Sequence, residues 1–509
     1  MSPRRVLVLS VVLVILCGVH NSNQCAKKDH GDADHQHNEQ IIRSEIPEER
    51  SVGEPSVHHE DKDDIQDAES NNLEQTKRLG PEPEEEEEEE EEDLDVEELA
   101  EGEMEDAEKT APARYDGAQL WRIHTSNVSN QDVIKLFESQ YDGCVWKTKD
   151  DFVDVFLEPH RQEEARRALR DFDVPYEVSI NDVQNLIDAQ HRSREKKPRR
   201  DKRQAQASHQ LTWDSYHDLG DIYGYMRTLS QKYPTICKLV NIGKSVEGRG
   251  ILAMKVAGPK SQRVIWVDGG IHAREWISVA SVMYVMDQFI RYWAKQPAHI
   301  RSATWYFLPV MNPDGYQYSR TTDRLWRKNR RNFGSCHGVD LNRNFDFKWT
   351  GVGASNNPCD MTYRGPKGLS EPESRSVAQF MEKLPRKPVA YITLHSYGQY
   401  VLYPWGFASA IPSDHRLLKQ TGLDAAESAK LIDGALYTVA PAFQPFGAAA
   451  GGSDDWAKGH LKVKYVYTIE LRDKGRYGFL LPTNLIRVTC REALTMIGVI
   501  SKASLNVQQ

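Results

Sequence analysis

The sequence predicts an α/β protein whose sheet is flanked by helices, preceded by a small α+β open sandwich and by a disordered acidic segment. Three observations favour this fold class. Three short apolar runs have the character of buried strands, and each leads to residues that can bind metal or transfer protons. An amphipathic stretch follows the first run. Charge and apolar content change sharply near residue 115, which separates a globular part from the segment before it.

The first residues have the features of a secretory signal. Arg4 and Arg5 precede an apolar run at 6–16, which predicts a signal peptide at residues 1–19 and a secreted, extracellular protein. The run is shorter than the ~20 residues that span a bilayer, so we expect no stable membrane insertion.

The next segment is strongly acidic. Residues 20–114 contain 34 Asp and Glu against 9 Lys and Arg, with nine consecutive glutamates at 84–92. Such a segment buries too little apolar surface to offset its ordering entropy, so we expect it to be disordered. The net charge of −10 therefore leaves residues 115–509 with +13. A solvated spacer is the favoured interpretation, and a segment that covers the basic domain or binds calcium or mineral is the alternative.

Apolar periodicity returns at residues 115–191. The pattern predicts a β-α-β-β-α order, with elements at 119–124, 130–141, 144–147, 152–157 and 160–172. Elements in this order form a compact open sandwich, in which helices cover one face of a small sheet.

The larger domain contains the first of the three apolar runs. Residues 263–267 are followed by Asp268-Gly-Gly270 and precede the amphipathic stretch at 276 to about 293. His272 and Glu275 are therefore expected on a strand-to-helix turn.

The other two runs end in similar residues. The run at 389–394 is followed directly by His395, and the run at 465–469 by Glu470. Catalytic groups in open α/β sheets gather outside the carboxyl ends of the strands. Each residue taken alone could be a satisfied histidine or a surface carboxylate, but their coincidence predicts one site.

The residue types at this site suit zinc. His272, Glu275 and His395 offer nitrogen, carboxylate and nitrogen ligands, and three protein ligands leave one position open for an activated water. Glu470 is a carboxylate that can accept a proton from that water if it lies within hydrogen-bond reach.

Seven motifs in order then reveal a family resemblance. From about Leu211 to Gly498 the chain resembles the zinc metallocarboxypeptidases of the carboxypeptidase A/B family. The motifs are His272-Ala-Arg-Glu-Trp276, Asn312-Pro-Asp-Gly315, Leu325-Trp-Arg-Lys328, Val339-Asp-Leu-Asn-Arg-Asn344, Leu394-His-Ser-Tyr397, Gly451-Gly-Ser-Asp-Asp-Trp456 and the segment Ile469–Phe479. The resemblance implies the metallocarboxypeptidase fold, a mixed twisted sheet flanked by helices, for residues 204–509. More loosely, residues 115–191 resemble the activation domain that caps the active site of procarboxypeptidases.

The resemblance also implies roles for individual residues. His272, Glu275 and His395 would hold one Zn²⁺, and Glu470 would be the general base. Arg327 would face the developing oxyanion, and Asp340 would orient His272. Asn342 and Arg343 would hold the terminal carboxylate of the substrate. Arg274 and Tyr397 would line the sites upstream of the scissile bond. A guanidinium fork binds a carboxylate bidentately, which would confine cleavage to free C-termini of peptides or proteins.

Two positions bear on substrate preference. In this family the position of Asp454 lies at the floor of the pocket for the leaving side chain. A buried carboxylate there favours Lys or Arg, because it needs a cationic partner. If Asp454 instead turns outward into solvent, neutral C-terminal residues remain the alternative. The family's mobile tyrosine is missing, since its position is Gly447 or, if the alignment slips by one, Phe446. We expect weaker substrate binding without loss of chemistry.

A basic linker separates the two predicted domains. Residues 192–203 contain eight Lys or Arg and end in Arg203. Behind a signal peptide, this pattern predicts a site for a furin-like processing protease that cuts after Arg203 and leaves 204–509 as the mature enzyme. A heparin-type contact is the alternative, and nucleic acid is not expected as a partner.

The chain has seven cysteines. The resemblance implies a disulfide between Cys336 and Cys359, worth roughly 3 kcal/mol in the chain-entropy model. Spacing does not decide whether Cys237 and Cys490 are free thiols or a pair.

The sequence thus favours a secreted zinc carboxypeptidase zymogen that releases Lys or Arg. The same enzyme with a neutral preference is one alternative. A non-catalytic secreted binding protein that keeps the fold is the other. The oligomeric state is left open.

Overall fold

The computed structural model describes residues 111–149, 151–195, 211–258, 261 and 263–505, which belong to one compact unit. The predicted signal peptide, the acidic segment up to residue 110 and the processing site at Arg203 lie outside the described residues. Within the described ranges, no helix combines the length and apolar character needed to cross a membrane.

The smaller domain is a four-stranded sheet with helices. Its strands have the order β2-β3-β1-β4 and its elements are β1 (Gln119–His124), α2 (Asn130–Gln140), β2 (Cys144–Lys149), β3 (Phe152–Leu157), α3 (Pro159–Asp171), β4 (Tyr176–Ile180) and α4 (Val183–Glu195). All five expected elements are present. Strand β4 and helix α4 were not predicted, and β4 is short with little burial, which explains its weak pattern. Strand β2 lies at an edge of this sheet.

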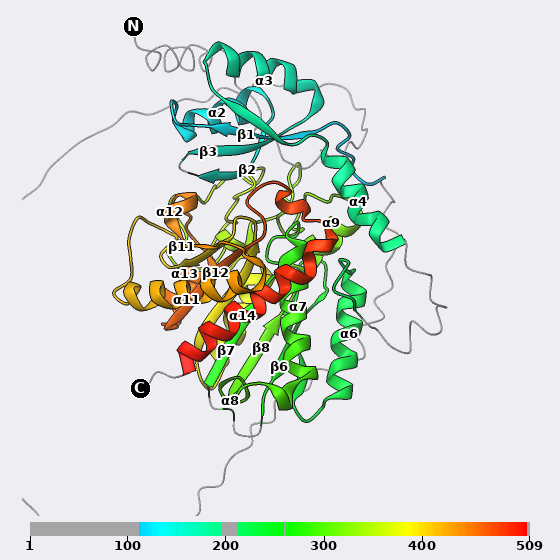
Figure 1. Cartoon of the computed structure of the whole chain (residues 1–509), viewed down its shortest axis with the longest axis vertical. Coiled ribbons are helices and arrows are strands. Elements are labelled where there is room, and N and C mark those ends of the chain that lie inside the picture. Colours follow the sequence, from blue (N-terminus) through cyan, green and yellow to red (C-terminus); the bar gives the residue numbers. More distant parts are fainter. Residues whose placement is uncertain (1–110, 150, 196–210, 259–260, 262, 506–509) are drawn as a thin grey trace, which may run out of the picture. The chain divides into compact units, whose positions relative to one another are not determined.

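Among the described residues, the larger domain is built on an eight-stranded mixed sheet with the order β11-β10-β12-β9-β7-β8-β6-β5. Figure 1 shows the neighbouring strands β7, β8 and β6 of this sheet. Its strands are β5 (Cys237–Lys244), β6 (Gly250–Val256), β7 (Arg263–Asp268), β8 (Ala303–Leu308), β9 (Pro388–Ser396), β10 (Tyr400–Tyr403), β11 (Thr438–Pro441) and β12 (Tyr465–Leu471). Its helices are α6 (Leu219–Lys232), α7 (Trp276–Arg291), α8 (Ala298–Arg301), α9 (Pro313–Thr321), α10 (Pro372–Lys383), α11 (His415–Asp433), α12 (Phe443–Phe446), α13 (Ser453–Gly459) and α14 (Ile486–Leu505). The mixed sheet flanked by helices is the fold class that the sequence predicts.

Both faces of this sheet are buried, which explains the nearly continuous apolar runs in its central strands. Along β7, Ile265 and Val267 pack into the core under α6, α7, α11 and α14. Val264 and Trp266 point the other way, into the core that α10 and α13 cover. Because strand side chains alternate between faces, one strand contributes to two separate cores.

The central strands β8, β7, β9 and β12 run parallel to one another. Their carboxyl ends therefore lie along the same edge of the sheet, where loops can direct side chains toward one point. This edge carries the predicted site.

Candidate active site

Three neighbouring parallel strands position the four central residues. His272 and Glu275 lie in the turn between β7 and α7, and Glu275 directly precedes the first residue of the helix. His395 and Glu470 are register partners on β9 and β12. Both lie inside their strands, one residue from the end, rather than just beyond the strand as the sequence suggested.

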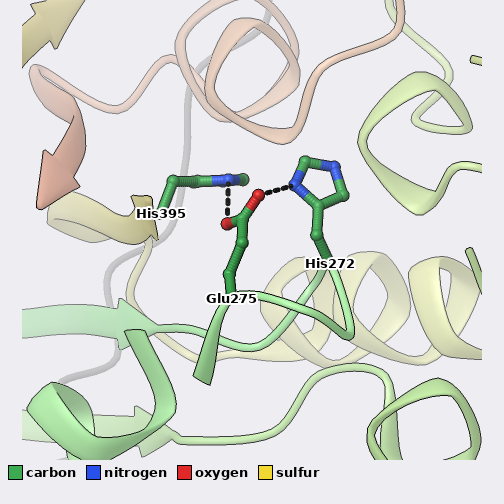
Figure 2. A group of neighbouring side chains, drawn as sticks. All are labelled: His272, Glu275 and His395. Carbon is green, nitrogen blue, oxygen red and sulfur yellow. Dashed lines mark hydrogen bonds and ion pairs between the residues drawn. The ribbon is translucent and has the colours of Figure 1, made fainter. Parts of the chain in front are cut away.

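The two histidines face one carboxylate (Figure 2). Nδ1 of His272 lies 2.7 Å from Oε1 of Glu275, and Nδ1 of His395 lies 3.2 Å from Oε2. All three residues are buried, and their three ligand atoms lie within 4.8 Å of one another. The structure thus brings together the predicted ligand set from positions more than 120 residues apart.

Asp340 contacts both His272 and Arg327. Its Oδ1 lies 3.1 Å from Nε2 of His272, and its Oδ2 accepts a 2.9 Å bond from Nη2 of Arg327. This carboxylate is fully buried, and although burial raises its pKa, Arg327 and Arg343 hold that pKa well below its usual range. Asp340 therefore stays ionised and fixes both the His272 ring and the Arg327 guanidinium.

The donor set fits a divalent metal. Burial raises the pKa of Glu275, but His272 and His395 outweigh it and hold that pKa well below its usual range. Burial and the nearby Arg327 lower the pKa of His272. Within the described residues, Nε2 of His395 is buried without a hydrogen-bond partner. An ionised carboxylate between two imidazoles, with donor atoms this close together, is a zinc-type ligand set.

Glu470 lines the same cleft, which has a volume of about 290 Å³. Burial raises its pKa to about 7, an effect that His395 opposes and Glu275 reinforces. A carboxyl group with such a pKa can exchange a proton near neutral pH.

Residues proposed to hold the substrate also line the cleft. Asn342 and Arg343 form a short turn after Asp340, and Oδ1 of Asn342 accepts a 2.9 Å bond from the backbone of Ser453. Asp454 is 7 % exposed, lines the cleft, and accepts a 3.1 Å bond from Oγ1 of Thr468. Asp454 therefore points inward, contrary to the solvated alternative.

Residues 222–496 match the family model described as zinc carboxypeptidase, and residues 121–190 match the carboxypeptidase activation peptide. This chain belongs to the zinc carboxypeptidase family. Carboxypeptidase B of Astacus astacus is 42% identical over 295 residues, which cover 57% of this chain and 97% of the relative. Carboxypeptidase B of Bos taurus is 34% identical over 403 residues, covering 76% and 93%. The solved structure of thrombin activatable fibrinolysis inhibitor matches with a TM-score of 0.70 at 32% identity, covering 77% of this chain and 100% of that one.

The carboxypeptidase is therefore a zinc enzyme with an activation peptide, and the structure shows where the two domains meet. Edge strand β2 lines the active-site cleft through residues 145–148, and His272 and Glu470 line the same cleft. Tyr397 donates a 3.2 Å hydrogen bond to Oδ2 of Asp154 in the activation domain. Arg122 bonds the same carboxylate and also the backbone carbonyl of Lys474.

Sequence reasoning did not identify every residue that lines the cleft. Lys147, Thr468 and Phe479 line it and were not predicted. Phe479 stacks under the buried guanidinium of Arg274, 4.0 Å from the ring centre. The position of Lys147 depends on docking between domains, for which a single strand pattern gives no signal.

The wall of the cleft near Gly447 contains an aromatic side chain. Phe446 ends α12, lines the cleft and packs against the Tyr400 ring with centroids 5.5 Å apart. Gly447 has φ +76°, where a residue with a side chain would be strained. Phe446 thus presents an aromatic ring without a hydroxyl group to the cleft.

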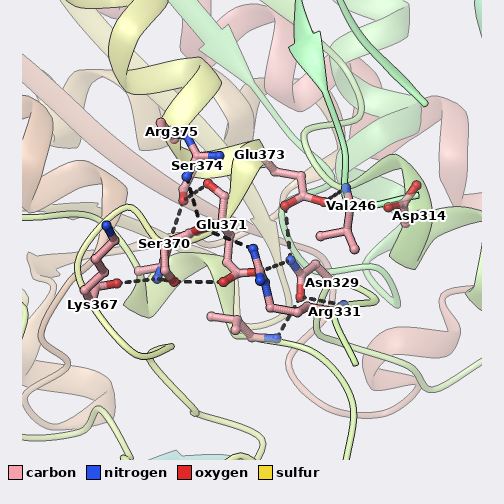
Figure 3. Close-up of polar contacts among 12 residues, drawn as sticks. Val246, Asp314, Asn329, Arg331, Lys367, Ser370, Glu371, Glu373, Ser374 and Arg375 are labelled. Carbon is pink, nitrogen blue, oxygen red and sulfur yellow. Dashed lines mark hydrogen bonds and ion pairs between the residues drawn. The ribbon is translucent and has the colours of Figure 1, made fainter. Parts of the chain in front are cut away.

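A buried network supports the segment that carries Arg327 (Figure 3). Nδ2 of Asn329 donates to Glu371 at 2.8 Å and to Glu373 at 3.1 Å, while its Oδ1 accepts from the Val339 backbone at 2.8 Å. Asn329, two residues after Arg327, therefore joins Val339, directly before Asp340, to Glu371 and Glu373.

The structure shows the state of the four cysteines in the larger domain. Cys336 and Cys359 form the expected disulfide, with Cα atoms 5.1 Å apart. Cys237 and Cys490 are both buried free thiols, which settles the question that spacing left open.

Proposed function

We propose that this zinc carboxypeptidase is a secreted zymogen that removes Lys or Arg from the C-termini of peptides or proteins. One observation carries the specificity: Asp454 places a buried carboxylate in the cleft, on the side where Asn342 and Arg343 lie. A substrate ammonium or guanidinium would pair with that carboxylate, whereas a neutral side chain would leave it unpaired at a cost.

The ligands of the zinc ion are assigned to His272, Glu275 and His395, with Asp340 as the residue that orients His272. Zinc, when bound, polarises the scissile carbonyl and makes water acidic enough to attack near neutral pH. The lowered pKa values of Glu275 and Asp340 keep both carboxylates negatively charged, which favours binding of a cation.

The protein's own residues then complete the hydrolysis. Glu470 accepts the proton that water loses as it adds to the carbonyl carbon, and returns it to the amine nitrogen as the C–N bond breaks. Arg327 offsets the charge on the carbonyl oxygen. Arg343 and Asn342 hold the terminal carboxylate, and Arg274 and Tyr397 bind the chain upstream of the scissile bond.

The specificity is tested with peptides that differ only in their last residue. The full-length protein, activated by cleavage in the basic linker, should cleave peptides ending in Arg or Lys with a kcat/KM at least about 100-fold above those ending in Leu or Phe. A chelator should abolish cleavage, and zinc should restore it.

The variant Asp454→Asn keeps the size of the side chain and removes its charge. It should lose most of the preference for basic residues, whereas Asp424→Asn, at an exposed position on α11, should not change it. Faster cleavage after Leu or Phe in the unmodified enzyme would instead favour a neutral specificity.

Secretion and processing are tested separately. Expression in animal cells should deliver the protein to the medium, with Gln204 as the N-terminus of the large fragment. Arg203→Ala should leave the secreted chain uncut. A large fragment that begins elsewhere would reject the furin-like site without affecting the assignment of the active site.

A further inference from the structure

Lys147 places a positive charge from the activation domain inside the active-site cleft. It lies on edge strand β2 and is only 7 % exposed. Among the described residues, its ammonium has no ion pair within 4 Å and no hydrogen bond. A buried ammonium is costly unless its surroundings compensate for the lost water.

Aromatic rings of the catalytic domain provide part of that compensation. Nζ of Lys147 lies 5.2 Å from the ring centre of Tyr397 and 5.2 Å from that of Tyr400. Both distances are within the range of a cation–π interaction. Gly398, between the two tyrosines, leaves room for the ammonium, because a Cβ atom there would lie 3.1 Å from Nζ.

Carboxylates act on the same charge from farther away. Burial lowers the pKa of Lys147 to about 8, and Asp154, Glu470 and Asp473 oppose that effect, while Arg122 adds to it. Asp154 belongs to the activation domain, but Glu470, Asp473, Tyr397 and Tyr400 all belong to the catalytic domain. Most of the groups that favour a cation therefore stay in the enzyme after the activation domain is removed.

We propose that Tyr397, Tyr400 and the nearby carboxylates form a subsite for a positively charged side chain upstream of the scissile bond, which Lys147 fills in the zymogen. The proposal extends the proposed function of the same cleft. With Asp454 selecting the last residue, the preferred substrates would have Lys or Arg upstream as well. Such C-termini arise when an endoprotease cuts after a cluster of basic residues, so that class of reaction would supply the substrate.

The test compares lysine with norleucine, which has an unbranched side chain of similar length and no charge. Peptides carry the C-terminal residue that the activated enzyme removes fastest, and lysine or norleucine is placed one, two or three residues before it. We expect one position at which lysine raises kcat/KM about fivefold over norleucine, chiefly through KM. Equal rates at all three positions would overturn the proposal.

Variants then locate the effect. Tyr400→Leu removes the ring and should bring the lysine-to-norleucine ratio close to one, whereas Tyr400→Phe keeps the ring face and should keep the ratio. An unchanged ratio in Tyr400→Leu would also reject the subsite. Because the C-terminal residue is chosen by experiment, an error in the Lys or Arg specificity would not be mistaken for failure of the upstream subsite.

Discussion

Two glutamates of the larger domain differ in what surrounds their carboxylates. Burial raises the pKa of both Glu470 and Glu373 to about 7. Glu373 accepts hydrogen bonds from the Val246 backbone at 3.0 Å and from Asn329 at 3.1 Å (Figure 3). Glu470 makes no hydrogen bond with the described residues and faces the cleft beside the histidines.

The comparison shows that a shifted pKa alone does not identify a catalytic group. Structural and catalytic carboxylates can both be desolvated. The two glutamates differ in their hydrogen bonds. The carboxylate oxygens of Glu470 have no hydrogen-bond partner among the described residues and face the cleft, whereas those of Glu373 accept hydrogen bonds from Val246 and Asn329. His395 and Asn329 differ in the same way. Nε2 of His395 has no hydrogen-bond partner among the described residues, whereas the Asn329 amide donates to Glu371 and accepts from the Val339 backbone.

The largest expected effect follows from removing the charge of Glu470. Glu470→Gln should lower kcat by about 10²- to 10⁴-fold, because the general base is lost. Zinc content measured by atomic spectroscopy should stay at one ion per chain. Glu373→Gln is the matched control, and its kcat should fall far less. Similar losses in both variants would show that the two glutamates do not differ in role.

The next effect concerns the stability contributed by Asn329, which donates a hydrogen bond to Glu373. Asn329→Ala removes the donor of Glu373 and the acceptor of the Val339 N–H, and leaves both groups buried. We expect the free energy of unfolding to fall by roughly 3 kcal/mol, measured by urea unfolding. Asn356→Ala, at an exposed position, should leave it within about 0.5 kcal/mol. A stable Asn329→Ala protein would mean that the network contributes little.

The pH dependence of stability should report Glu373. Its pKa is about 7 in the folded state and close to 4.5 when unfolded, so between these values only the folded protein binds the proton. This contribution is fully present below about pH 4.5 and is lost as the pH rises to about 7. Thermal unfolding from pH 5 to 7 should therefore show a smaller fall in stability for Glu373→Gln than for the unmodified protein. An identical slope would contradict the raised pKa.

The smallest effect concerns the missing tyrosine. Phe446→Tyr adds a hydroxyl group at the cleft, where it can bond the substrate carboxylate. A gain of about 1 kcal/mol would lower KM about fivefold and leave kcat nearly unchanged. Phe446→Leu serves as the control for a change of side chain without a new hydroxyl. If Phe446→Tyr changes kcat instead, the residue acts on the chemistry and not on binding.

Short-range patterns predicted three of the eight strands that the described residues of the larger domain form, while β5, β6, β8, β10 and β11 were not predicted. The runs that became β7, β9 and β12 were expected, as were the residues at their ends, because buried parallel strands are nearly continuously apolar. Strand β4 and helix α4 were not expected. Strand β4 has only one buried residue, so its pattern is weak and its place depends on pairing with β1.

The sequence by itself determined the family, the fold class, the metal-type ligands and the candidate specificity residue, because each leaves a local motif or a strand pattern. Only the tertiary structure decided that Asp454 points inward, that Asn329 joins two segments of the scaffold, and that Lys147 enters the cleft. These facts depend on contacts between residues far apart in the chain. No local pattern encodes such contacts, since they form only when the domains fold and dock.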